Sequence, residues 1–304
     1  MSVAAWAALL VAIAGLFAFD LFFAHRGEVS LRRAATWTVW WMAVGIGFGL
    51  IVLATLGSTA AGSYWAGFLM EKALSLDNVF VIAVLLGTFA VPQELKADVL
   101  TFGIAVALML RALFIFGGVT LLEFFHPALY AMGALLIFTG IRLMVKSDSA
   151  DDFAEGRTMH TLRRLLPVGR EYRGRWMVAR EAGRRVATPL LAALLAVALA
   201  DVIFAVDSIP AVLAITHDTF LIFAANAFAL LGLRALYFLL DGMAQRFEYL
   251  RYGLGALLVF VGVKMVVEDV VGHLPVGISL GVIAAVLGVS VGASLLLSSK
   301  REYV

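Results

Sequence analysis

The sequence of 304 residues contains no cysteine. Disulfide bridges, thiolate metal sites and thiol-based catalysis are therefore excluded for these residues. Charged side chains are also scarce, at 14% of the residues, whereas 63% are hydrophobic and the mean hydropathy is +1.00. Because soluble domains carry about 25% charged residues, this composition indicates a membrane protein with several spanning helices. A soluble enzyme or a nucleic-acid-binding protein is not expected.

Long apolar stretches recur along the whole chain, and each is long enough for an α-helix to cross the hydrocarbon core of a bilayer. We predict an all-α, polytopic membrane protein with nine spanning helices. The first stretch has neither a basic leader nor a small-residue cleavage site, so we interpret it as a retained helix. The predicted spans are residues 3–24, 34–56, 64–90, 97–122, 128–146, 188–214, 219–240, 250–268 and 276–298.

Basic residues are confined to alternate connections between these spans. Eighteen lysines and arginines lie in one set of connections and the C-terminal tail, ten of them in 146–187. The opposite connections (57–63, 123–127, 215–218 and 269–275) contain none. Cytoplasmic loops of membrane proteins carry an excess of Lys and Arg. The pattern therefore predicts a multi-pass membrane protein with its N-terminus outside and its C-terminus in the cytoplasm; for a bacterial protein, this membrane would be the inner (cell) membrane.

The two halves of the chain share three sequence patterns in the same order. Leu110-Arg111-Ala-Leu recurs as Leu233-Arg234-Ala-Leu, Gly133-Ala-Leu-Leu recurs as Gly255-Ala-Leu-Leu, and an acidic motif precedes each pair. Since each unit holds an odd number of helices, the second is inverted in the membrane relative to the first. We divide the chain into two N-terminal helices (1–56), a first three-helix repeat (57–146), a basic cytoplasmic linker (147–187), a second, inverted repeat (188–268), and a last helix with its tail (269–304).

The two acidic motifs lie inside apolar helices. They read Glu71-Lys-Ala-Leu-Ser-Leu-Asp77-Asn78 and Asp201-Val-Ile-Phe-Ala-Val-Asp207-Ser208. A charged group at the bilayer centre costs about 2.5–3.5 kcal/mol on insertion scales, so it is rarely there without a function. Six residues turn an ideal helix by about 600°, so the two acids of one motif do not share a face. Either the helix unwinds, for which Pro210 gives a reason, or the two motif helices face each other.

Oxygen atoms make up the whole candidate ligand set, which suits hard cations such as Mg²⁺, Ca²⁺ or Mn²⁺. Asp20, near the end of the first predicted span, is either a fifth carboxylate of the site or an ordinary helix-end residue. Arg111 and Arg234 are candidate charge partners, which either pair with the motif acids or compete with a bound metal ion. The candidate metal ligands are Glu71, Asp77, Asn78, Asp201, Asp207, Ser208 and Asp20.

Both motifs, and nearly the whole chain around them, resemble the TerC/Alx family of integral membrane proteins. The resemblance implies that Glu71, Asp77, Asp201 and Asp207, with Asn78 beside them, bind metal. It also implies Mn²⁺ export, since characterised members of the family are associated with that activity, and it places the chain near the LysE group of small exporters. Coordination chemistry alone leaves Mg²⁺ and Ca²⁺ open.

The sequence predicts a secondary transporter that exports a divalent metal by alternating access, with Mn²⁺ as its substrate and no redox or nucleotide cofactor. No nucleotide-binding motif is present, so a gradient would drive transport. Metal binding requires deprotonated carboxylates, which makes protons a candidate counter-ion. The alternative is a non-transporting membrane scaffold or a subunit of a tellurite-resistance complex. An intramembrane aspartyl protease is disfavoured because its Gly-x-Gly-Asp motif is absent.

Overall fold

A computed structural model describes residues 1–24, 30–125, 127–145, 172, 174–181, 184–241, 250–271 and 275–298. These residues form ten α-helices and one antiparallel pair of strands. The helices are α1 (Val3–Ala24), α2 (Leu31–Leu56), α3 (Ser58–Thr88), α4 (Gln93–Phe124), α5 (Ala128–Val145), α8 (Pro189–Leu213), α9 (Thr219–Leu230), α10 (Leu233–Asp241), α11 (Leu250–Val271) and α12 (Val276–Ser298). The strands are β1 (Val178–Glu181) and β2 (Arg184–Ala187).

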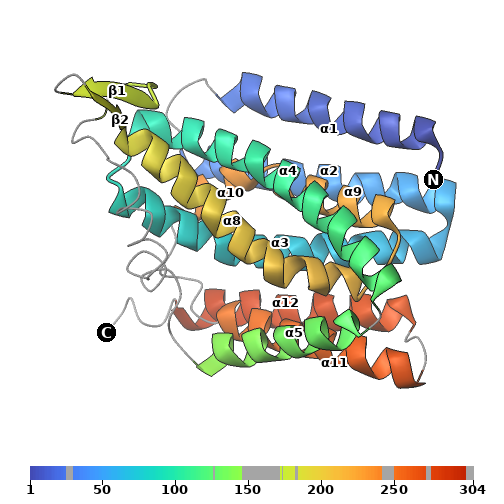
Figure 1. Cartoon of the computed structure of the whole chain (residues 1–304). Helices are drawn as coiled ribbons and strands as arrows, with labels where there is room; N and C mark the ends of the chain where they lie inside the picture. The colour runs from blue at the N-terminus through green and yellow to red at the C-terminus, as the bar shows by residue number, and fades with distance from the viewer. Residues whose placement is uncertain are drawn as a thin grey trace.

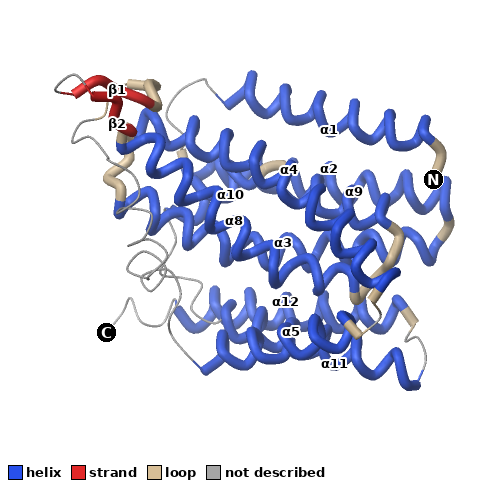
Figure 2. The backbone as a smooth tube through the Cα atoms, viewed as in Figure 1, coloured by secondary structure: helices blue, strands red, loops and turns tan. Residues whose placement is uncertain are grey.

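The helices lie side by side along one direction (Figure 1). Helices α5, α11 and α12 form one layer, and α1, α2, α4, α9 and α10 lie on the other side of α3 and α8 (Figure 2). Helix α3 occupies the middle, since it packs against α2, α8, α9, α10 and α12. The first acidic motif is therefore carried into the centre of the protein.

Five of these helices are long and apolar enough to cross a membrane, namely α1, α2, α4, α8 and α12. Helices α9 and α10 pass the same test together, as one span bent by 42°, which makes six. The structure thus has the helices of a polytopic membrane protein. The sequence predicts nine spans, which is more than these six. The apolar segments of α5 and α11 are shorter, and α3 is not among the described helices that pass. Nine spans remain a prediction.

A β-hairpin lies within the predicted cytoplasmic linker, where an all-α fold predicts none. Its strands pair from Val178 with Ala187 to Glu181 with Arg184. Tyr172, which precedes the hairpin, contacts the helix bundle: its hydroxyl donates a hydrogen bond to the carbonyl of Phe89 at 2.7 Å. Two strands of four residues carry too little alternation to be recognised from sequence. Residues 147–171, 173, 182 and 183 of the linker lie outside the described residues.

Helices α5 and α11 cross at two pairs of glycines. A Cβ atom built on Gly140 would lie 2.5 Å from the carbonyl oxygen of Gly255, and one on Gly262 would lie 2.7 Å from that of Gly133. In the predicted repeat, Gly133 matches Gly255 and Gly140 matches Gly262. The contacts thus run crosswise between matched positions, as two-fold-related helices would make them. This observation supports the inverted repeat, which otherwise stays a prediction.

Within the part of the chain that the structure describes, one marked break in the central helices separates α9 from α10. Gly232 adopts φ +81°, and a Cβ atom there would lie 2.4 Å from Cγ of Trp41. A larger residue would therefore be strained in its backbone and would clash with the indole. Helix α8, by contrast, is continuous and contains Pro210. The predicted unwinding at Pro210 is wrong, and the second possibility holds: α3 and α8 pack against each other.

Candidate ion site

Helices α3 and α8 each direct one polar face into the centre of the bundle. Glu71, Ser75 and Asn78 are spaced i, i+4 and i+7, which places them on one face of α3. Asp201 and Ser208 have the same i, i+7 spacing on α8. All are buried except Asp201, whose side chain is 13% exposed. The two faces meet because the helices pack together.

Arg111 of α4 joins the two faces. Its Nη1 donates to Oε2 of Glu71 and, at 2.6 Å, to Oδ1 of Asn226 on α9. Its Nε lies 3.9 Å from Oδ1 of Asp201. The guanidinium is only 1% exposed, so its charge is compensated by these groups and hardly by solvent. One arginine therefore connects α3, α4, α8 and α9.

Four buried oxygen atoms of this cluster have no hydrogen-bond partner among the described residues. They are Oε1 of Glu71, Oγ of Ser75, Oδ2 of Asp201 and Oγ of Ser208. A buried polar atom without a partner costs about 1–3 kcal/mol, so such a concentration needs an explanation. Carboxylate and hydroxyl oxygens are ligands that hard divalent cations accept. These oxygens are therefore of the chemical type that binds a hard cation, and Nε and Nη2 of Arg111 beside the two carboxylates also lack hydrogen-bond partners among the described residues.

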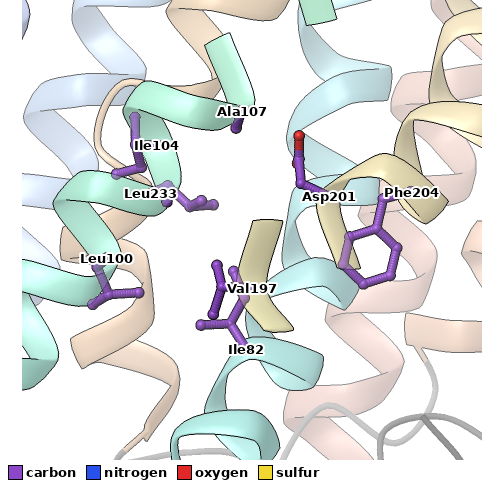
Figure 3. Close-up of a pocket in the computed structure, with 9 residues that line it drawn as sticks. Ile82, Leu100, Ile104, Ala107, Val197, Asp201, Phe204 and Leu233 are labelled. Carbon is purple, nitrogen blue, oxygen red and sulfur yellow. The ribbon is translucent and has the colours of Figure 1, made fainter. Parts of the chain in front are cut away.

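A small cavity lies beside Asp201 (Figure 3). The space in which the centre of a water molecule fits is about 20 Å³, which is room for one water-sized particle. The other lining residues are apolar or glycine and come from α3, α4, α8 and α10, among them Ile104 and Leu233. A polar occupant of this cavity would find Asp201 as the one carboxylate among its nine lining residues.

A second buried ion pair lies apart from this cluster. Nη2 of Arg234 on α10 is 2.8 Å from Oδ2 of Asp20 on α1, and Nη1 donates to Oγ1 of Thr101 at 3.2 Å. Asp20 therefore neutralises Arg234 and does not join the Glu71–Asp201 group. Of the two predicted charge partners, Arg111 contacts motif acids and Arg234 pairs with Asp20 instead.

We expect Asp20 and Arg234 to stabilise the fold as a unit. Asp20→Asn and Arg234→Gln should each lower the free energy of unfolding, and the double variant should lose less than the sum, by a coupling of about 1–3 kcal/mol. Chemical unfolding in detergent of the four proteins measures this coupling. Strictly additive losses would show that the ion pair does not contribute. The more exposed pair of Arg175 and Asp98, at 2.7 Å, should couple by less than about 1 kcal/mol; it is a comparison and not an independent control, because Asp98 also interacts electrostatically with Arg234.

Asp77 and Asp207 lie within α3 and α8, but their side chains are not among those described. Among the described side chains, no three Asp, Glu or His come together closely enough to hold a metal ion. The predicted set of four carboxylates is therefore untested. Ser75, Lys72 and Asn226 stand outside the predicted ligand set. Ser75 lies on the same face of α3 as Glu71, Lys72 donates to a backbone carbonyl at the end of α9, and Asn226 accepts from Arg111.

The packed helices and the buried charged residues Glu71, Arg111 and Asp201 define a polytopic helical membrane protein. The sequence profile of the integral membrane protein TerC family matches residues 56–302, and the chain belongs to that family. No solved protein structure matches the chain significantly.

Several similar proteins cover nearly the whole chain. The uncharacterized membrane protein STKORF319 of Myxococcus xanthus is 41% identical over 295 residues, which are 96% of this chain and 92% of the relative. Alx of Escherichia coli K12, whose name provisionally assigns it as a membrane-bound redox modulator, is 38% identical over 293 residues, 93% and 91% of the two chains. Alx of Salmonella typhi is 37% identical over 308 residues, 98% and 95%.

Proposed function

We propose that this protein is a secondary transporter that exports Mn²⁺ through the site between α3 and α8. The observation that carries the proposal is the set of unpartnered carboxylate and hydroxyl oxygens on Glu71, Ser75, Asp201 and Ser208. Metal ions supply what these atoms lack, since a cation accepts several oxygen ligands at once. Arg111 then neutralises the carboxylates when the metal is absent.

The charges of the motifs favour a divalent ion. The two motifs contribute four carboxylates and one ammonium group, and Arg111 adds one guanidinium. The formal charges of these groups sum to −2, with the ammonium group of Lys72 placed at the carbonyl of Leu231, in a region where an unpaired charge is costly. A divalent cation balances them. Oxygen ligands leave Mg²⁺ and Ca²⁺ as competitors of Mn²⁺, and we propose Mn²⁺ on the family resemblance of the motifs.

Transport across the membrane requires the site to open to one side at a time. We propose that the two repeat units move against each other, with protons as the exchanged ion. A redox role, as the name of the Escherichia coli relative suggests for that protein, would have to work without cysteine chemistry, because these 304 residues contain no thiol.

Ion flux into proteoliposomes tests the proposal. With purified protein and a pH-sensitive dye inside, we expect saturable Mn²⁺ uptake and a rise of the internal pH as protons leave. Asp77→Ala and Asp201→Asn should abolish the flux, because each removes a carboxylate of the motifs. Glu94→Gln is the matched control, since this acid is exposed at the start of α4 and should leave flux unchanged.

Each outcome separates the alternatives. Flux that survives loss of the motif acids would exclude this site. No flux of Mn²⁺, Mg²⁺ or Ca²⁺ through well-folded protein would favour the non-transporting scaffold. Mn²⁺ uptake without a pH change would support the proposed transport of Mn²⁺ and would exclude proton exchange.

A further inference from the structure

Lys72 directly follows Glu71 on α3, yet its side chain contacts a different part of the protein. It is 9% exposed, and its Nζ donates to the carbonyl oxygen of Leu231 at 3.2 Å. No carboxylate of the described side chains lies within salt-bridge distance of it. The ammonium group therefore contacts the backbone at the C-terminal end of α9.

A buried cation at this point stabilises a broken helix. The C-terminal end of a helix presents carbonyls without intrahelical partners and the negative end of the helix dipole. In an unbroken helix, the carbonyl of Leu231 would accept from the amide of residue 235. Lys72 replaces that donor, so it favours the break over the continuous helix.

The corresponding helix of the first repeat has no break. The match of Leu110-Arg111 to Leu233-Arg234 aligns Gly232 with Met109, and α4 is continuous there. The two arginines consequently differ in their partners. Arg111, on the straight helix, contacts Glu71 and approaches Asp201. Arg234, after the 42° bend, contacts Asp20.

The bent segment already borders the ion site. Leu233, the residue before Arg234, lines the cavity beside Asp201. If α9 and α10 joined into one straight helix, the turn that carries Arg234 would reorient next to that cavity. A second guanidinium would then be available to Asp201.

We propose that Lys72 is a positioning residue: its ammonium group keeps the helix broken at Leu231–Gly232, and the break keeps Arg234 paired with Asp20 and away from Asp201. The consequence for metal binding rests on the proposed function, because an additional guanidinium at Asp201 competes with a cation.

Hydrogen exchange tests the structural part without any transport. In the broken form, the amides of residues 232–235 begin α10 and have no i−4 partners, since the first bond after the break runs from Leu236 to Gly232. In Lys72→Met, we expect these amides to exchange about tenfold more slowly as they join a continuous helix. Lys72→Arg should retain the wild-type rates, and Lys72→Gln serves if the methionine variant does not fold. Unchanged or faster exchange in the neutral variants overturns the proposal.

Mn²⁺ affinity, measured by titration calorimetry on purified protein, tests the consequence. Lys72→Met should weaken binding about tenfold, the factor that one charge-assisted hydrogen bond carries. Adding Asp20→Asn and Arg234→Gln to Lys72→Met should restore affinity to within about threefold of wild type, because the competing guanidinium is gone. A merely structural role predicts further loss in the combined variant, and that result overturns the proposal. If wild-type protein binds no Mn²⁺, the proposed function fails while the exchange result still decides the role of Lys72.

Discussion

Replacing Arg111 with methionine is expected to lower the free energy of unfolding by about 3–5 kcal/mol. The guanidinium is buried among Glu71, Asn226 and Asp201, and its loss leaves two carboxylates without their cation. Breaking one side of a buried ion pair is costly because the remaining charge is uncompensated. Unfolding in detergent can be followed by the fluorescence of the six tryptophans.

Two comparisons make this result specific. Arg142→Met, at an exposed position of α5, should change stability by less than about 0.5 kcal/mol. Glu71→Gln combined with Arg111→Met should be more stable than Arg111→Met alone, since one unpaired charge is removed with the other. A double variant as unstable as the single one would mean that Arg111 acts through packing and not through its charge.

Added Mn²⁺ should stabilise Arg111→Met more than it stabilises the wild type. In the wild type, the guanidinium holds the carboxylates that the metal needs, whereas in the variant they are free to bind it. A ligand that binds only the folded state raises stability with its concentration. Equal stabilisation of both proteins would show that Arg111 and the metal do not share these carboxylates.

Substituting Gly140 with alanine is expected to cost about 1–3 kcal/mol, although alanine is the better helix former. Its Cβ would lie 2.5 Å from the carbonyl oxygen of Gly255 and 2.9 Å from the amide nitrogen of Val259. Both are backbone atoms, so no side-chain rotation relieves the contact and α5 must move away from α11. Gly255→Ala should behave alike, because its Cβ would lie 2.6 Å from the carbonyl oxygen of Gly140.

Gly47→Ala is the matched control on α2, where nothing lies within 4 Å of the added Cβ. There the gain in helix propensity should be free of any clash and should stabilise the protein by up to about 1 kcal/mol. Thermal unfolding of the three variants compares the effects directly. Equal melting temperatures for Gly140→Ala and Gly47→Ala would rule out the close crossing of α5 and α11.

The sequence alone predicts the class of protein and the places of most helices. Hydropathy is a local property, and in a bilayer every backbone polar group must be bonded within its own helix. Apolar stretches therefore mark helices whatever their neighbours are. The acidic motifs are detectable for the same reason, since Glu71 and Asp201 stand out against the apolar residues around them.

The spacing of the acidic residues alone was not enough to predict the whole candidate site. The interval of six places Asp77 and Glu71 on different faces of an ideal helix, whereas Ser75 and the predicted ligand Asn78 share a face with Glu71. The hairpin of β1 and β2 was missed because its strands are short. Both features are encoded in the local sequence, but each local sequence signal is weak by itself.

Tertiary structure decided which charges meet. Arg111 and Arg234 stand in nearly identical local sequences, and nothing near them says that one contacts Glu71, 40 residues away, and the other Asp20, 214 residues away. The two differ at the break between Leu231 and Gly232, where Gly232 adopts φ +81° beside the ring of Trp41 and the carbonyl of Leu231 accepts from Lys72. Hydropathy marked where most of the helices lie, whereas the charge pairs and the helix break depend on atoms that only packing brings together.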